Sequence, residues 1–174
     1  MFKWKLIQLT GLCLILISCS KPEQKIFIPE DKNFSIVMPC KPKMQSESST
    51  FKDYIVHSKV YRCHGLEYAY VVTYSEYPIE VYKEYSAEEL VAGVVKRLEF
   101  VDPPFEFISK KTVDVSGVKA IQVNSRILSP RALYKNVIFY AGNGIYQIAY
   151  SAKKDIFDNP GTDAFYASMT FGKQ

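Results

Sequence analysis

Apolar and polar residues alternate along much of this chain, which is the two-residue period of a strand with one buried face. The clearest cases are Phe34 to Met38, Phe51 to Arg62 and Leu66 to Tyr74, and the last two predict a hairpin. The Ser- and Gln-rich residues 44–50 lack this period and predict a loop. Further strands are predicted over 26–29, 107–115, 118–127, 133–141, 145–151 and 169–171.

One segment has the period of a helix instead. Ser86-Ala87-Glu88-Glu89 is a capping box, in which the side chains of Ser86 and Glu89 are expected to cap each other's backbone N–H groups. Apolar residues then recur at helical spacing, and the helix is expected to stop before Pro103-Pro104. Residues 76–85 predict a connector, and Thr162 to Ser168 predicts a short closing helix.

The order of these elements indicates the fold class. Strands come first, then a helix, then about four antiparallel strands and a last helix. Gly142-Asn143-Gly144 joins the last two long strands, and Asn-Gly predicts a type I′ hairpin turn because both residues tolerate positive φ angles. The chain is therefore predicted to form an α+β domain, an antiparallel sheet with helices packed against it.

Residues 1–18 have the pattern of a secretory signal. Lys3 and Lys5 precede an apolar run over 6–17 that is shorter than the roughly 20 residues of a membrane-spanning helix. The run ends in Leu16-Ile17-Ser18-Cys19, which resembles the bacterial lipobox. The resemblance implies cleavage before Cys19 and attachment of fatty acyl chains such as palmitate to it, and the alternative is an uncleaved or secreted chain in which Cys19 is incidental.

This interpretation divides the chain into a lipoprotein signal peptide at 1–18, a lipid-anchored tether at 19–25 and a single domain at 26–174. The expected location is the bacterial cell envelope. Ser20 follows the cysteine where lipoproteins of the inner membrane often carry Asp, so the outer membrane is favoured in an organism that has one.

Charge and composition set limits on the partners. The formal net charge of the chain is +4, and two of its positive charges, Lys3 and Lys5, lie in the signal. The remaining balance is too small to indicate nucleic acid as a partner. The hydrophobic fraction of 48% and the charged fraction of 23% are typical of a globular domain.

The cysteines also bear on the location. Cys19 takes the lipid, and Cys40 and Cys63 remain as a pair in a compartment that permits disulfides. A bridge between them is favoured over two free thiols. A metal site with His57 or His64 is the least favoured alternative, because no spacing here matches a zinc pattern.

Several core and turn positions resemble the PsbP/Mog1-like fold. They are Phe34-Ser35-Ile36-Val37-Met38-Pro39, the helix after the first hairpin, Ile145-Tyr146-Gln147 and residues 165–171. The family includes photosystem-associated proteins, a nuclear-transport factor and many bacterial envelope lipoproteins. What its members share implies mostly non-enzymatic binding to protein partners, and a resemblance of core positions concerns fold rather than function.

Motifs of common catalytic sites do not occur in the sequence. His57 and His64 lie in or beside the first predicted hairpin, and no nucleophile elbow accompanies them. Gly142-Asn143-Gly144 lacks the third glycine and the following helix of a phosphate-binding loop. We therefore expect no enzymatic activity, no catalytic residue, no cofactor and no metal.

Two stretches have the chemistry of a binding surface. Tyr77 and Tyr82 belong to a tyrosine-rich group before the helix that would suit a protein partner, although such rings can instead fasten the helix to the sheet. The second stretch, 125–135, would suit an anion, although a solvated turn is the more ordinary interpretation. The first group is Tyr74, Tyr77, Tyr82 and Tyr85, and the basic residues of the second are Arg126, Arg131 and Lys135.

The sequence thus predicts a lipid-anchored envelope lipoprotein whose domain binds or scaffolds an envelope protein. The alternative function is a module that binds a small ligand or lipid in a cleft between helix and sheet, at the membrane surface. A large apolar pocket beside the first helix would favour the alternative, and a flat exposed tyrosine patch would favour a protein partner.

Overall fold

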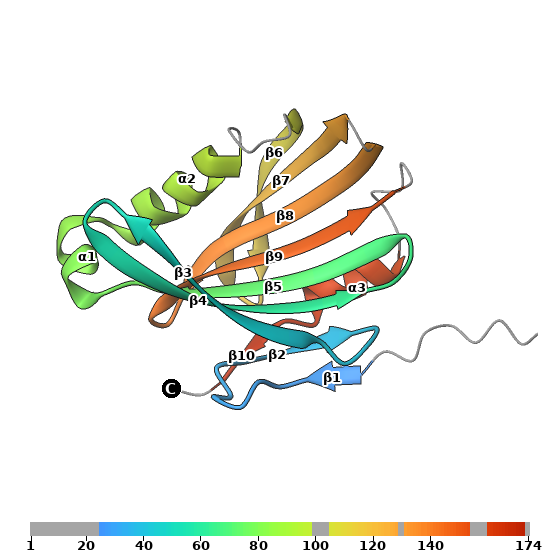
Figure 1. Ribbon diagram of the computed structural model, residues 1–174, viewed down its shortest axis with the longest axis horizontal. Helices are drawn as coiled ribbons and strands as arrows, with labels where there is room; N and C mark the ends of the chain where they lie inside the picture. The colour runs from blue at the N-terminus through green and yellow to red at the C-terminus, as the bar shows by residue number, and fades with distance from the viewer. Residues whose placement is uncertain (1–24, 99–104, 129–130, 154–159, 173–174) are drawn as a thin grey trace, which may run out of the picture.

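A large antiparallel sheet is the main element of the fold. The computed structural model describes residues 25–98, 105–128, 131–153 and 160–172. Seven strands pair in the order β3-β4-β5-β9-β8-β7-β6, which makes β3 and β6 the two edges (Figure 1). Their bounds are β3 Lys43–Phe51, β4 Tyr54–His64, β5 Tyr68–Glu76, β6 Phe105–Val115, β7 Val118–Leu128, β8 Arg131–Ala141 and β9 Gly144–Ala152.

The predicted signal peptide lies outside the described residues. The same holds for its residues Leu16, Ile17 and Ser18, for the acylation site Cys19 and for the tether up to residue 24. Within the described part of the chain, no helix is both long and apolar enough to cross a bilayer.

A second, smaller sheet joins the two ends of the domain. It consists of β1 (Lys25–Phe27), β2 (Phe34–Met38) and β10 (Thr170–Phe171), and β2 pairs antiparallel with both neighbours. Figure 1 shows it below the large sheet. The prediction of a short last strand is therefore correct, and its partner is the first well-formed strand of the chain.

Aromatic rings hold the two sheets together. We call this group the inter-sheet aromatic cluster. Ring centroids lie 5.2 to 5.8 Å apart where a ring of the small sheet meets one of the large sheet. Its members are Phe27, Phe34 and Phe171 on the small sheet, and Tyr61, Tyr74, Phe139 and Tyr146 on the large sheet.

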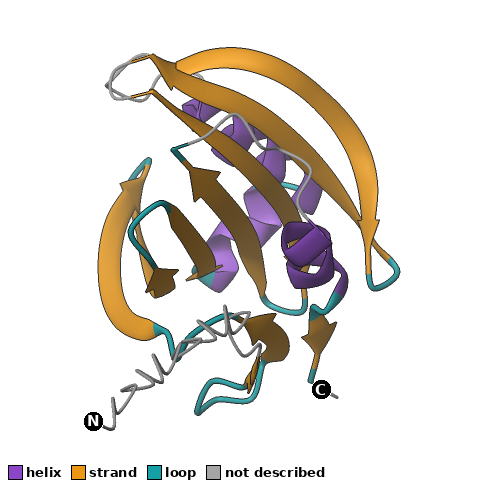
Figure 2. Cartoon of the chain, turned by 90° about the vertical axis from the view of Figure 1, so that its right-hand side faces the viewer, coloured by secondary structure: helices purple, strands orange, loops and turns teal. Residues whose placement is uncertain are grey.

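Both faces of the large sheet are buried, and the sheet is strongly curved (Figure 2). The helices α1 (Ile79–Glu84) and α2 (Ala87–Leu98) pack on one face, and α3 (Pro160–Ala167) packs with the small sheet on the other. The sequence predicts helices against the sheet but does not divide them between its faces. Helix α3 lies on the face opposite α1 and α2 because its fully buried Phe165 packs against Tyr70, with the ring centroids 4.9 Å apart. Tyr70 belongs to the core between the large sheet and the small sheet.

Helix α2 begins as its capping box predicts. The backbone N–H of Glu89 donates to Ser86 Oγ at 3.2 Å, and the backbone N–H of Ser86 donates to Glu89 Oε2 at 2.8 Å. These bonds satisfy two N–H groups that the helix itself leaves without partners. The buried face of α2 then carries Leu90, Val91 and Val95.

Residues 44–50, predicted as a loop, form most of the edge strand β3. Eight of its nine residues are exposed, so neither face of the strand carries an apolar pattern. The strand forms because its backbone pairs continuously with β4, from Lys43 opposite Arg62 to Phe51 opposite Tyr54. The predicted connector 76–85 also contains structure, since α1 begins after Pro78.

The β8–β9 hairpin is confirmed, but its turn differs by one residue from the prediction. Ala141 pairs with Gly144, so the two turn residues are Gly142 and Asn143. Of these only Gly142 has a positive φ, of 59°. A positive φ at the first turn residue is typical of a type II′ turn rather than type I′.

Cys40 and Cys63 form the predicted disulfide, with their Cα atoms 5.8 Å apart. The bridge connects the segment after β2 to the end of β4, and so it adds a covalent link between the two sheets. Cys63 is buried while its neighbour His64 is exposed, as alternation along a strand requires. On the chain-entropy estimate, a loop of this length stabilises the fold by about 3 kcal/mol.

Candidate binding site between the two sheets

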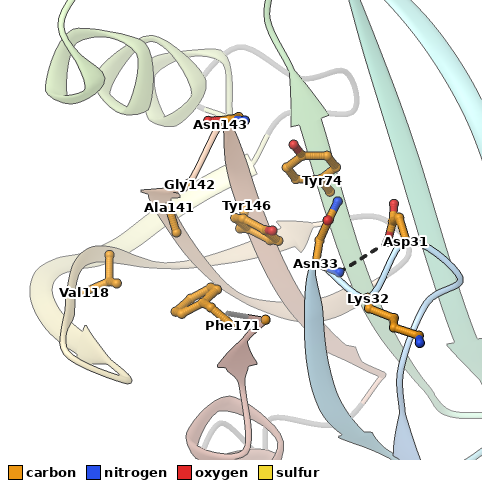
Figure 3. A pocket seen from close by; sticks show the side chains of 11 residues that line it. Asp31, Lys32, Asn33, Tyr74, Val118, Ala141, Gly142, Asn143, Tyr146 and Phe171 are labelled. Atoms are coloured by element: carbon orange, nitrogen blue, oxygen red, sulfur yellow. Dashed lines mark hydrogen bonds between the residues drawn. The ribbon is translucent and has the colours of Figure 1, made fainter. Parts of the chain in front are cut away.

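An open recess of about 400 Å³ lies where the small sheet meets the β8–β9 hairpin. Three segments far apart in sequence form most of it: the β1–β2 turn, the β8–β9 hairpin and the chain around β10 (Figure 3). Tyr74 of β5 and Val118 of β7 complete it. The residues that line it are Asp31, Lys32, Asn33, Tyr74, Val118, Ala141, Gly142, Asn143, Tyr146, Phe171 and Gly172.

Aromatic rings form the apolar part of the recess. Tyr146 is only 3% exposed and stacks on Phe139, with ring centroids 5.4 Å apart and an angle of 9° between the rings. The rings of Tyr74 and Phe171 lie 4.9 and 5.7 Å from that of Tyr146. Packed on several sides, these rings are held in place and offer a rigid apolar surface to a bound group.

The β1–β2 turn forms the polar rim. Lys32 has a positive φ of 52°, and its N–H donates to the carbonyl oxygen of Pro29 at 3.0 Å. The Lys59 ammonium contacts the Asp31 carboxylate at 2.6 Å and ties the turn to β4. The N–H of Gly172 donates to the carbonyl oxygen of Asn33 at 3.0 Å, which joins the turn to the chain after β10.

The opposite rim is the β8–β9 turn. The Tyr82 hydroxyl donates to the carbonyl oxygen of Asn143 at 2.7 Å and thereby anchors the turn to α1. The Asn143 side chain is exposed at the edge of the recess (Figure 3). An amide at this position can both donate and accept hydrogen bonds.

Burial raises the pKa of the two phenols in the recess above their ordinary value. It raises the pKa of Tyr146, and the neighbouring Tyr74 adds to that rise. Burial likewise raises the pKa of Tyr74, with smaller contributions from Glu76 and Asp31. Both hydroxyls are protonated at neutral pH, as ordinary phenols are, and the raised pKa values extend this state to higher pH. They can donate or accept hydrogen bonds, but neither is suited to act as a base.

The structure corrects the predicted tyrosine surface. Tyr77 is 6% exposed and belongs to the core under α1 and α2, where its ring lies 5.6 Å from that of Phe51. Tyr82 is half-buried, and its hydroxyl is occupied by the β8–β9 turn. These rings fasten the helices to the sheet, and their burial removes Tyr77 from any partner surface.

The second predicted stretch, 125–135, is not a loop over its described residues, which end β7 and begin β8. Lys135 is 9% exposed, and its ammonium lies 3.1 Å from the Asp163 carboxylate and 5.0 Å from the centre of the Tyr166 ring. Arg126 contacts Glu106 at 3.4 Å. Lys135 is thus paired inside the protein and Arg126 at its surface, while the side chain of Arg131 lies outside the described part of the chain. The two described cations therefore do not form the cluster of unpaired charges that an anion would need.

The histidines also have ordinary surroundings. Ser48 Oγ of β3 and His57 Nδ1 of β4 lie 3.2 Å apart in an exposed contact between the two strands. Within the residues that the structure describes, no three His, Cys, Asp or Glu side chains gather closely enough to hold a metal ion.

Sequence reasoning missed the recess because its parts are local turns that become neighbours only in the fold. Two glycines in or beside the recess carry a local signal of the close packing there. A Cβ atom on Gly144 would meet the Tyr74 ring and the carbonyl oxygen of Ser75, and one on Gly172 would meet the carbonyl oxygen of Lys32. Glycine is needed at both positions because backbone and ring approach closely there.

Comparison with known proteins identifies the architecture. The solution structure of cyanobacterial PsbP (CyanoP) from Synechocystis sp. PCC 6803 matches with a TM-score of 0.56 at 12% identity, covering 89% of this chain and 96% of that one. The chain has a PsbP-like fold.

Other comparisons add no further information about this PsbP-like domain. A Pseudomonas aeruginosa protein of unknown function, PA94, matches with a TM-score of 0.38 at 10% identity, over 74% of this chain and 82% of that one, and we draw nothing from it. No family model and no curated protein matches by sequence.

Gly144→Ala tests the packing at the recess. The substitution is expected to destabilise the domain by about 1–3 kcal/mol, because the new methyl group cannot fit beside Tyr74 and the backbone of Ser75. Gly93→Ala in α2 is the matched control, since nothing lies within 4 Å of a Cβ there. Helix propensity favours alanine at that position by up to about 1 kcal/mol. The free energy of unfolding of both variants is measured by denaturant titration. If Gly144→Ala is as stable as Gly93→Ala, the β8–β9 hairpin and Tyr74 are not in close contact.

Proposed function

We propose that this chain is a lipid-anchored lipoprotein of the bacterial envelope whose PsbP-like domain binds a protein partner and catalyses no reaction. The anchor rests on Leu16-Ile17-Ser18-Cys19 and the apolar run before it. The binding role rests on the recess between the two sheets. Rigid rings, phenols kept protonated and backbone turns line it, and this set of groups suits recognition rather than bond-breaking.

The size of the recess fits one inserted side chain of a partner. A volume of about 400 Å³ is at the small end for a ligand pocket, and the recess is open to solvent rather than enclosed. An aromatic or long aliphatic side chain would pack against Tyr146 and Phe171. Asn143 and the charged residues of the β1–β2 turn would contact the polar groups around it, as in the apolar centre and polar rim of protein interfaces.

A second candidate function is the binding of a small ligand beside α2. A hollow of about 360 Å³ lies between the start of α2 and the strands β6 to β8. Val91, Ile121 and Tyr140 give it an apolar lining, while Glu88 and Lys119 lie at its edge. This is the cleft between helix and sheet that a ligand-binding module would use.

Cys19→Ala tests the anchor. The variant is expected to lose palmitate labelling and to move from the membrane to the soluble fraction, with at least a tenfold fall in the bound share. Each buried methylene of the acyl chains contributes about 0.8 kcal/mol, so losing two or three chains removes the attachment. Ser20→Ala serves as the control and should partition like the natural chain. Unchanged partitioning of Cys19→Ala would contradict the anchor.

Crosslinking from the recess tests the partner. A photoreactive p-benzoylphenylalanine at Asn143, in the full chain and in the native envelope, is expected to form a protein adduct. The same group at Asp53, exposed in the β3–β4 turn away from the recess, is the control. Ala141→Phe should fill the recess and remove the Asn143 adduct without loss of folded protein.

The products decide between the two candidate functions. A protein adduct that needs both Asn143 and an open recess supports the proposal. Adducts that are the same at Asn143 and Asp53, or that persist in Ala141→Phe, would contradict it. A small-molecule adduct would favour the ligand-binding alternative.

A further inference from the structure

Three exposed aliphatic side chains lie near Lys25, the first residue that the structure describes. Ile26 is 70% exposed, Ile28 is 57% exposed and Met44 is 58% exposed. We call them the apolar patch. Such residues on a monomeric domain carry little meaning singly, but a group of them marks a surface that contacts something.

Strand geometry turns the patch outward. Phe27 points into the inter-sheet aromatic cluster, with its ring 5.2 Å from that of Tyr61. Its neighbours Ile26 and Ile28 therefore point away from the core, because side chains alternate along an extended chain. On the large sheet, Met44 lies opposite Tyr61 in the pairing of β3 with β4.

Ile28 and Met44 belong to one continuous surface. Both line an open hollow of about 330 Å³, together with Pro29, Lys41 and Pro42. Prolines in the segments on either side restrict the backbone around it. Ile28 and Met44 thus form one shaped, partly apolar surface, and Ile26 is exposed two residues before Ile28.

The distance to the proposed anchor indicates what covers this surface. Six residue steps separate Cys19 from Lys25, the first residue of β1. Whatever its conformation, a chain of that length spans at most about 20 Å. Acyl chains on Cys19 would therefore keep Lys25, the residue next to Ile26 of the apolar patch, within that distance of the bilayer surface.

Charge beside the patch favours the same occupant. Lys41 lines the hollow, and Lys41 and Lys43 are both exposed on the segment that leads into β3. Two acids line the hollow as well: Glu30 is exposed, and the Asp31 carboxylate contacts Lys59. Lysines beside exposed aliphatic groups are typical of surfaces that rest on anionic lipid headgroups.

We propose that the apolar patch, with Lys41 and Lys43, rests on the headgroup region of the bilayer that holds the lipid anchor. This inference depends on the acylation of Cys19 in the proposed function. It adds an orientation to that function. Asp31 lines both the hollow beneath the patch and the recess, so the recess would open close to the membrane surface. A partner would then have to enter the recess close to the membrane surface.

Tryptophan fluorescence can test the orientation. Trp4 is the only tryptophan of the chain and lies in the proposed signal, so a mature chain beginning at Cys19 contains none. Ile28→Trp and Met44→Trp then place one reporter each on the apolar patch. Ile55→Trp is the matched control, because Ile55 is 58% exposed and lies towards the far end of the β3–β4 hairpin.

The full-length lipoprotein variants are produced in a bacterial host, and the purified mature proteins are reconstituted into vesicles of anionic phospholipid with brominated acyl chains. We expect the reporters at 28 and 44 to be quenched at least twofold more than the one at 55. Equal quenching at the three positions, with the protein still bound to the vesicles, would overturn the inference and leave the anchor intact. Failure of the proteins to bind the vesicles at all would overturn both. Circular dichroism of each variant verifies that it is folded.

Discussion

The packing of the inter-sheet aromatic cluster, which joins the small sheet to the large one, is the interaction on which the rest of this structure depends. The strands of the small sheet have only three, five and two residues, and a sheet of that size is not stable alone. Its stability comes from burying Phe34 between Tyr61 and Tyr146, with ring centroids 5.7 and 5.8 Å away. Edge-to-face pairs of this kind contribute about 0.5–1.5 kcal/mol each beyond the area they bury.

The same contact positions both surfaces to which we assign a role. The recess exists because β2 and β10 bring the β1–β2 turn and Phe171 beside the β8–β9 hairpin. The apolar patch exists because Phe27 points inward and leaves Ile26 and Ile28 outside. The disulfide between Cys40, which follows β2, and Cys63 of β4 also holds the small sheet to the large one. The binding at a membrane surface that we propose would therefore be a consequence of how the two ends of the domain pack on its centre.

Local chemistry in the sequence was enough to predict part of this fold. The start of α2 follows from Ser86 and Glu89, whose side chains cap the helix without help from the rest of the molecule. Most long strands follow from alternation, because one of their faces is apolar. The cysteine pair follows by elimination, since Cys40 and Cys63 are the two that remain after the predicted signal and the predicted acylation site.

Features that depend on tertiary contacts could not be predicted in this way. The edge strand β3 has no apolar face, and only its pairing with β4 makes it a strand. No sequence pattern distinguishes Tyr77 from Tyr82. In the fold the ring of Tyr77 is buried, and the hydroxyl of Tyr82 donates a hydrogen bond to the β8–β9 turn. The recess is assembled from turns at residues 31–33 and 142–143 and from the chain at 171–172, whose proximity no local pattern encodes.

Native-state hydrogen exchange of the full chain tests most directly whether the aromatic contact unites the two sheets. If the account is correct, the backbone amides of β2 exchange only when β5 and β9 also open, with the same free energy and the same dependence on denaturant. Exchange of β2 through a separate opening of lower free energy, while β5 and β9 stay protected, would show that the small sheet is an independent flap and would contradict the account.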